Sequence, residues 1–240
     1  MILANVRVRL DRNDAQLVLR LVSAGSATEY AAAERRLVDE GIEPLLDDPR
    51  LLRGLLTARQ GQCASIALFT YVLVRQALLQ AGERDRPIAD YVASILLQFG
   101  LRDRARRISD TDDDLVTTLA ELLEVAERAH PQRAFLARAH LGNYALWLSG
   151  LFPDHVEARR WRRGAPGLDY VEAMGTRGFR MAAEHRLANE HGLAPLFGAA
   201  ADRFPLIRRA LNDVSDRLLF PNHHSPERLM RQVRSAFEVH

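Results

Sequence analysis

The sequence contains no lysine and only one cysteine. All 33 basic residues are arginines, and the formal net charge of the 240 residues is +2. Without lysine there is no Walker-type phosphate loop, and no G-x-G-x-x-G sequence links a strand to a helix. Arginine without lysine, together with abundant Ala, Leu and Asp, indicates a GC-rich coding genome. The single Cys63 excludes an intrachain disulfide and suits a reducing compartment, so we expect a cytoplasmic protein.

Long apolar stretches are also lacking. The longest runs for 12 residues, from Cys63 to Val74, whereas about 20 are needed to span a bilayer. The N-terminal residues do not have the order of a secretory signal. We expect no membrane association. The run predicts instead a helix over about Gln62 to Gln80 that is buried on all sides.

Strand patterns are almost absent. Only Ile2 to Leu10 alternates apolar and polar residues with the period of a strand, and no second such segment is there to pair with it. We expect a short extended arm, a strand completed across a dimer, or the beginning of the first helix. The rest of the chain has helical periodicity bounded by Gly and Pro. It predicts an all-α, multi-helix bundle of roughly eight to eleven helices.

The charge reverses sharply between Arg102 and Asp114, in the sequence RDRARRISDTDDD. Arginines at the end of one helix and aspartates at the beginning of the next are what the helix dipoles favour. We expect a single all-helical domain over residues 1–240. The alternative is two helical halves that are divided near residues 101–114.

The sequence lacks the spacing of known metal sites. A di-iron site in a helical bundle needs two Glu-x-x-His pairs, and the chain has one, Glu127 and His130. There is no His-Glu-x-x-His sequence, and the pair His223 and His224 falls short of the three or four ligands that zinc needs. We therefore expect no metal and no cofactor.

Cys63 is the one candidate nucleophile. It follows Gln62 at the predicted start of a helix, where the positive end of the dipole favours a thiolate. The five residues Gln60 to Ala64 resemble thiol hydrolases of the papain and transglutaminase type, and the resemblance implies a catalytic cysteine. The aromatic and glycine context of those families is missing. The alternative is a small core cysteine, and we expect the protein not to be an enzyme.

The densest mixture of aromatic, glycine, arginine and histidine residues lies between Leu141 and His185. Its first part belongs to a helix predicted from Arg133 to Leu151. His140, Asn143 and Trp147 share one face of that helix, because they are three and seven residues apart. A polar group beside an aromatic ring can contact a ligand. The alternative is a buried His and Asn that bind backbone groups.

A second helix is predicted from Asp169 to Glu190 or His191, with Asp169 and Glu172 forming a capping box. One stripe of this helix consists of Tyr170, Met174, Gly178, Met181 and His185. Gly175 and Gly178 each cost about 1 kcal/mol relative to alanine. Close approach of another helix or of a ligand would offset this cost, and we expect helix packing.

Between the two helices lies the sequence Arg159-Arg160-Trp161-Arg162-Arg163, followed by Gly164, Pro166 and Gly167. This composition predicts a surface turn. Four arginines around one tryptophan can clamp a phosphate or a carboxylate. The alternative is a solvated loop whose arginines pair with nearby Asp and Glu.

The last helix is predicted to begin at Pro226, capped by Ser225. Its apolar residues recur with the period of a helix, so we expect them to face the core. They are Leu229, Met230, Val233 and Phe237.

These features favour a protein that binds a protein partner, or itself as a homodimer, through the surface around Arg159 to Arg163 and the following helix. The alternative is a helical bundle that binds a small molecule, as an enzyme or a carrier, in a pocket lined by His140, Asn143, Trp147, Tyr170, Met174 and His185. A second alternative is weak nucleic-acid binding through the arginines of this surface and Arg102, Arg104, Arg106 and Arg107. Nucleic acid is the least favoured partner, because the net charge is near zero.

The sequences LGNYALWLSGLFPDH and DYVEAMGTRGFRMAAEH resemble uncharacterised helical bacterial proteins, and this resemblance implies no activity.

Overall fold

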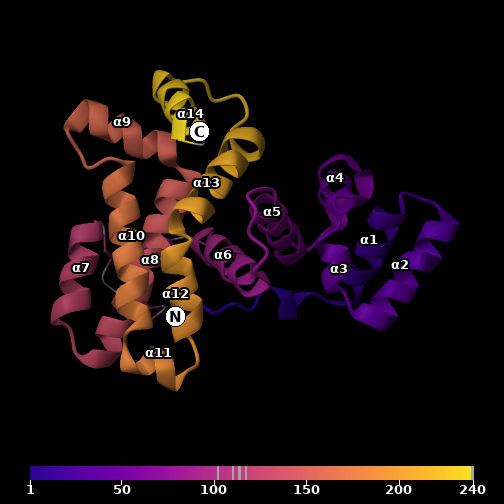
Figure 1. The fold of residues 1–240 in the computed structure, drawn as a ribbon, viewed down its shortest axis with the longest axis horizontal. Coiled ribbons are helices and arrows are strands. Elements are labelled where there is room, and N and C mark those ends of the chain that lie inside the picture. The colour runs from indigo at the N-terminus through magenta and orange to yellow at the C-terminus, as the bar shows by residue number, and fades with distance from the viewer. Residues whose placement is uncertain (102, 110, 113–114, 117, 239–240) are drawn as a thin grey trace. The chain divides into compact units, whose positions relative to one another are not determined.

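The computed structural model describes residues 1–240 except 102, 110, 113–114, 117 and 239–240, and at 60, 62 and 234–238 it describes only the backbone. This part of the chain contains fourteen α-helices, twelve of them with seven or more residues, and no strand (Figure 1). The predicted all-α class is therefore confirmed. The number of helices exceeds the prediction by three, because α3 (Glu43–Leu46), α9 (Pro153–Arg163) and α11 (Arg186–Glu190) were not expected as separate helices.

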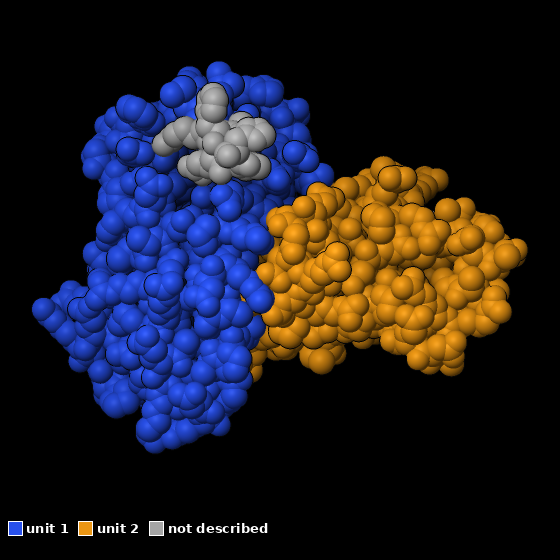
Figure 2. Space-filling model, in the orientation of Figure 1, with its two compact units in different colours: residues 1, 99–240 blue, residues 2–98 orange. Residues whose placement is uncertain are grey.

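The chain forms two compact units, coloured separately in Figure 2. One comprises residues 2–98, and the other comprises residue 1 with residues 99–240. The division between Gln98 and Phe99 comes just before the segment in which the charge reverses.

The unit of residues 2–98 is built around α5, the predicted apolar helix. Its helices are α1 (Arg12–Ser23), α2 (Ala27–Glu40), α3, α4 (Pro49–Thr57), α5 (Ile66–Gln80) and α6 (Arg86–Phe99), of which only Phe99 belongs to the other unit. Ten of the fifteen residues of α5 are buried. The helix begins at Ile66 rather than Gln62, because Ser65 caps it and its Oγ accepts a hydrogen bond from Leu68 N at 3.0 Å.

The N-terminal segment forms neither a strand nor part of α1. Its only regular element is a short 3₁₀-helix, Arg7–Arg9. Asp90 Oδ1 on α6 accepts hydrogen bonds from Val6 N at 2.9 Å and Arg7 N at 3.0 Å, and Ser94 Oγ accepts one from Asn5 N at 3.2 Å. Side chains of a helix thus satisfy backbone donors that a strand partner would otherwise have paired.

The unit of residues 99–240 is organised around one long helix, α8. Its helices are α7 (Leu119–Arg128), α8 (Pro131–Leu151), α9, α10 (Leu168–Ala183), α11, α12 (Ala194–Asp202), α13 (Phe204–Val214) and α14 (Pro226–Glu238). α8 packs against α7, α10 and α13, and α10 packs in turn against α12 (Figure 1). α8 begins at Pro131, two residues before the predicted Arg133, and ends at Leu151 as predicted.

α8 and α10 approach each other closely at bare backbone. A Cβ atom placed on Gly178 of α10 would lie 2.7 Å from Gly142 N and 3.0 Å from Arg138 O, both on α8. A Cβ on Gly175 would lie 2.3 Å from the ring of Phe204 on α13. Close helix packing therefore explains both glycines inside α10, as the sequence predicted.

Side chains of α13 and the turn after it complete the C-terminal end of α8. Asn212 Nδ2 donates to Ser149 O at 2.7 Å and to Gly150 O at 2.8 Å, and Ser215 Oγ donates to Leu151 O at 2.7 Å. These carbonyls have no partner within their own helix. After Val214 the chain widens into a π-helical turn, Ser215–Leu219.

Candidate functional site

The arginine-rich segment that was predicted as a surface turn is the last part of a helix, α9. Pro153 occupies the first position of α9, where a missing N–H leaves no bond unmade. The helix ends at Arg163 because Gly164 adopts the left-handed conformation, with φ of 61°. The prediction of a turn at Arg159 to Arg163 was therefore wrong, and only residues 164–167 connect α9 to α10.

Three of the four arginines on α9 have no ion-pair partner in the described part of the chain. They are Arg159, Arg162 and Arg163. The fourth, Arg160, lies 3.8 Å from the buried Glu157 and 6.0 Å from the ring centre of the exposed Trp161. The predicted alternative was a loop whose arginines pair with acids; the segment is a helix, and only Arg160 has such a pairing.

α10 begins at Leu168, one residue before the predicted cap. No side chain caps it from the preceding position, and Leu168 N donates instead to the buried Glu157 Oε1 at 3.4 Å. The predicted capping box of Asp169 and Glu172 was wrong. Glu172 Oε2 accepts a hydrogen bond from Arg208 Nε on α13 at 2.6 Å.

α10 also ends earlier than predicted, at Ala183. His185 has an extended backbone and caps α11, since its Nδ1 accepts a hydrogen bond from Leu187 N at 3.2 Å. The prediction of one continuous helix to Glu190 or His191 was wrong for this reason. The ring of His185 stacks on Phe135, with 5.2 Å between ring centres.

His140 is a core residue. Only 3% of it is exposed, and its Nε2 lies 3.0 Å from Ala105 O, which it can bind as a donor. Its ring contacts Phe99 at 5.4 Å and Tyr144 at 6.3 Å between centres. Burial and the nearby charge of Arg104 lower the pKa of His140 to about 4. The residue is therefore neutral at pH 7.

The predicted ligand-binding residues do not meet in one place. Trp147 joins the cluster of His140, through ring contacts with Tyr144 at 6.0 Å and Phe152 at 4.8 Å. His185 belongs to a different set of rings, around Phe135. Two further residues of the predicted pocket are buried among packed helices; these are Asn143 and Met174.

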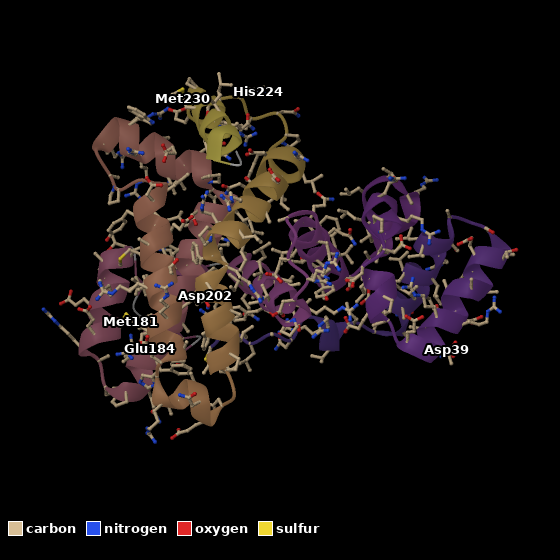
Figure 3. The ribbon with its side chains drawn as sticks, in the orientation of Figure 1. Asp39, Met181, Glu184, Asp202, His224 and Met230 are labelled. Carbon is tan, nitrogen blue, oxygen red and sulfur yellow. The ribbon has the colours of Figure 1, made fainter. Side chains whose placement is uncertain are left out.

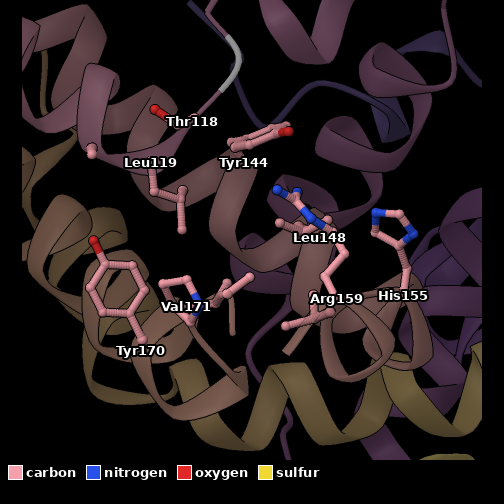
Figure 4. Close-up of a pocket in the computed structure, with 12 residues that line it drawn as sticks. Thr118, Leu119, Tyr144, Leu148, His155, Arg159, Tyr170 and Val171 are labelled. Atoms are coloured by element: carbon pink, nitrogen blue, oxygen red, sulfur yellow. The ribbon is translucent and has the colours of Figure 1, made fainter. Parts of the chain in front are cut away.

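A pocket does exist nearby, between α7, α8, α9 and α10, and has a volume of about 280 Å³ (Figure 4). Its walls are mainly apolar and include Leu119, Ala120, Leu148, Val156, Pro166 and Val171. The polar groups that border it are Thr118, Tyr144, His155, Arg159 and Tyr170. Among the described residues that line it there is no Asp or Glu.

The guanidinium of Arg159 points toward the Tyr144 hydroxyl in this pocket (Figure 4). Burial raises the pKa of Tyr144, and the positive charges of Arg106 and Arg159 oppose the increase. Tyr144 is therefore a neutral hydrogen-bonding group at pH 7. The pocket combines one fixed cation, Arg159, with hydroxyl groups and the imidazole of His155.

Of the ten predicted site residues, only Arg159 and Tyr170 line this pocket. Sequence analysis missed Tyr144 and His155. The available signal was helical spacing, which places His155, Arg159 and Arg162 on one face. In a segment that is interpreted as a loop, this spacing does not predict that the three side chains share a face.

The C-terminal helix α14 buries the face that was predicted to be exposed and exposes its apolar face. Leu229, Met230 and Val233, which were expected to face the core, are 62%, 53% and 44% exposed, and Met230 lies at the outer edge of this region (Figure 3). Arg228 and Arg231 are only 6% and 5% exposed. The side chain of Phe237, the fourth residue of the predicted apolar face, lies outside the described residues.

A network of charges explains this orientation. Arg228 Nε donates to Asp154 Oδ2 at 2.8 Å, and Arg231 Nη2 donates to Asp154 Oδ1 at 3.0 Å and Asp216 Oδ1 at 2.7 Å. Arg228 Nη1 also donates to Phe220 O at 2.8 Å. Burial lowers the pKa of Arg231, and the bonds to Asp216 and Asp154 more than compensate, so the pKa is raised overall. Buried charges need such partners.

Three more exposed apolar residues, Leu218, Leu219 and Phe220, lie at the end of the π-helical turn, five residues before α14. The bond from Arg228 to Phe220 O ties the two segments together. We call Leu218, Leu219, Phe220, Leu229, Met230 and Val233 the C-terminal apolar patch.

A second pocket, of about 360 Å³, lies between α9 and the beginning of α14. Phe152, Phe220 and Arg162 line it, and His223 Nε2 lies 3.9 Å from Asp154 Oδ2 at its border. His224 is exposed (Figure 3). In the part of the chain that the structure describes, no three His, Cys, Asp or Glu side chains are placed to hold a metal ion.

Two arginines of the cluster between Arg102 and Arg107 donate hydrogen bonds to backbone carbonyls of their own segment. Arg104 is buried and its Nη1 donates to Arg107 O at 2.6 Å, and Arg107 Nη1 donates to Asp112 O. Arg106 is exposed. Arg102 lies outside the described residues.

Cys63 is exposed at the end of a short 3₁₀-helix, Arg59–Cys63. It lies before Ser65, which caps α5, and so stands outside the first turn in which a thiolate was expected. The predicted alternative, a small core cysteine, is wrong, because Cys63 is exposed.

None of the described helices has the length and apolar character required to cross a bilayer. Comparison with known proteins gives no match to a family model, a curated protein or a solved structure.

Proposed function

We propose that this protein acts by binding a second copy of itself through the C-terminal apolar patch. The observation that carries the proposal is the orientation of α14, whose arginines are buried and whose Leu229 and Met230 are more than half exposed. Single exposed apolar residues are ordinary, whereas a cluster of them indicates an interaction surface. An amphipathic helix with its apolar side outward is suited to packing against another helix.

The charges beside the patch favour a second copy over an unrelated partner. Asp213 and Arg217 are exposed, lie one helical turn apart and have no ion-pair partner in the described part of the chain. A two-fold axis brings the same surface of both copies together, so that Asp213 of each copy can face Arg217 of the other. The net charge of +2 gives little repulsion between copies.

Light scattering after size-exclusion chromatography tests the proposal. Over protein concentrations from about 1 µM to about 500 µM, a range that covers weak to moderate affinities, the mass should rise from 27.0 kDa to twice that value. The double substitution Leu229→Glu and Met230→Glu should keep the protein monomeric, because it places charges in the centre of the interface.

The control is Val38→Glu, which places a charge at an exposed apolar residue on α2, outside the C-terminal apolar patch. It should leave the mass unchanged. A constant mass of 27.0 kDa over the whole range would contradict self-association. A dimer that persists in the double variant would show that other residues form the interface.

A further inference from the structure

The pocket between α7, α8, α9 and α10 differs from the C-terminal apolar patch in that it is concave and bordered by a cation. We infer that this pocket binds a small carboxylate with an apolar body, with Arg159 as the group that holds the carboxylate. Neither the patch nor self-association enters this inference, which depends only on the residues around the pocket.

The charge of the pocket selects an anion. Arg159 lines it and has no acidic partner in the described part of the chain, and the lining contains no carboxylate of its own. Arg159 is exposed at the border of an apolar site, where its planar guanidinium can pair with a carboxylate through two parallel hydrogen bonds. The Tyr144 hydroxyl, toward which Arg159 points, supplies a further neutral donor (Figure 4).

The walls select an apolar body and set its size. Leu119, Leu148, Val156 and Val171 come from four different helices and face the same space. The volume of about 280 Å³ lies near the lower end of the range for small-molecule sites, which is about 300–1,000 Å³. A carboxylate with a chain of about eight carbons, or with one aromatic ring and a short linker, fits this volume.

A single carboxylate fits better than a phosphate. One guanidinium and neutral hydroxyl groups balance one negative charge, whereas a phosphate monoester carries up to two charges and three acceptor oxygens that need several cations or backbone donors. Arg162 and Arg163 do not line this pocket, and lie instead along a neighbouring one of about 360 Å³ that shares His155 and Arg159.

Isothermal titration calorimetry with octanoate tests the inference, and octanamide serves as the neutral ligand of the same shape. Octanoate should bind at least tenfold more tightly than octanamide, because a hydrogen bond to a charged group is worth about 1.5–3 kcal/mol. Arg159→Gln should weaken octanoate binding at least tenfold and leave octanamide binding within about twofold of its original value.

Arg163→Gln is the matched control, since it removes the same charge from the same helix outside the pocket. It should change neither affinity by more than about twofold. Ala165→Phe fills the space beside Pro166 and should abolish binding of both ligands. The inference is overturned if octanoate does not bind, if octanoate and octanamide bind equally well, or if Arg163→Gln weakens octanoate as much as Arg159→Gln does. Binding that survives Ala165→Phe would likewise place the ligand elsewhere.

Discussion

The contact between α8 and α10 predicts that Gly178→Ala destabilises the unit of residues 99–240. The new methyl group would lie 2.7 Å from Gly142 N and 3.0 Å from Arg138 O. Both atoms belong to the backbone of α8, so no side chain can rotate away to make room. The two helices would have to move apart along a contact that forms the centre of this unit.

The size of the effect is the difference between two opposing contributions. Alanine in place of glycine inside a helix favours folding by about 1 kcal/mol. Overpacking a core costs about 1–3 kcal/mol, and we expect the upper end of that range because rigid backbone is the obstacle. The net loss is about 2 kcal/mol, which lowers the melting temperature by about 4–8 °C for a protein of this size.

Tryptophan fluorescence is a suitable assay, because both tryptophans of the chain, Trp147 and Trp161, lie in the unit of residues 99–240. The control is Gly198→Ala in α12. A Cβ atom there meets no atom within 4 Å, so this substitution should raise the melting temperature by a few degrees. A Gly178→Ala protein that melts at or above the wild-type temperature would refute the packing argument, provided that the control behaves as expected.

Two further predictions concern buried charges. Because the pKa of His140 is about 4 and that of an unfolded histidine about 6.5, only the unfolded state binds a proton between these values. Stability is therefore lost as the pH falls from 6.5 to 4, by about 2 kcal/mol between pH 7 and pH 5, and urea titrations of His140→Gln should show this loss reduced. Asp154→Asn removes a partner that Arg228 and Arg231 share, at a cost of about 3 kcal/mol, so amide exchange in residues 226–233 should accelerate about a hundredfold. Exchange in the same segment should stay unchanged in a variant of the exposed Asp39 (Figure 3), Asp39→Asn, and equal acceleration there would contradict the role of Asp154.

The parts of the fold that the sequence predicted well are those in which local signals agree. α8 has apolar residues along most of its length, a proline at its first position and Gly150 near its end, so the prediction of its boundaries required no knowledge of its neighbours. The two glycines inside α10 also predicted, without further information, that a neighbouring helix packs closely there. A residue that weakens an isolated helix is retained where another backbone lies against it.

α9 escaped prediction because its apolar signal is weak. Val156 is its only buried large aliphatic residue, and four arginines with one exposed tryptophan make up most of its second half. The remaining indications were Pro153 before the segment and Gly164 after it, and these bound a loop as readily as a helix. The pocket beside Arg159 was lost with the helix, since its residues come together only when His155 and Arg159 are one turn apart.

For α14 the sequence predicted the helix correctly and the buried face wrongly. The period of Leu229, Met230 and Val233 correctly predicted a helix, and it also fixed which residues share a face, but it contained no information on which side meets the protein. That choice depends on Asp154 and Asp216, which lie 74 and 15 residues away from their arginine partners. Two carboxylates at one place on the surface make the charged side of the helix the better one to bury. The apolar side is then left facing outward, so the contacts that hold α14 in place are the same ones that create the surface proposed to bind a second copy.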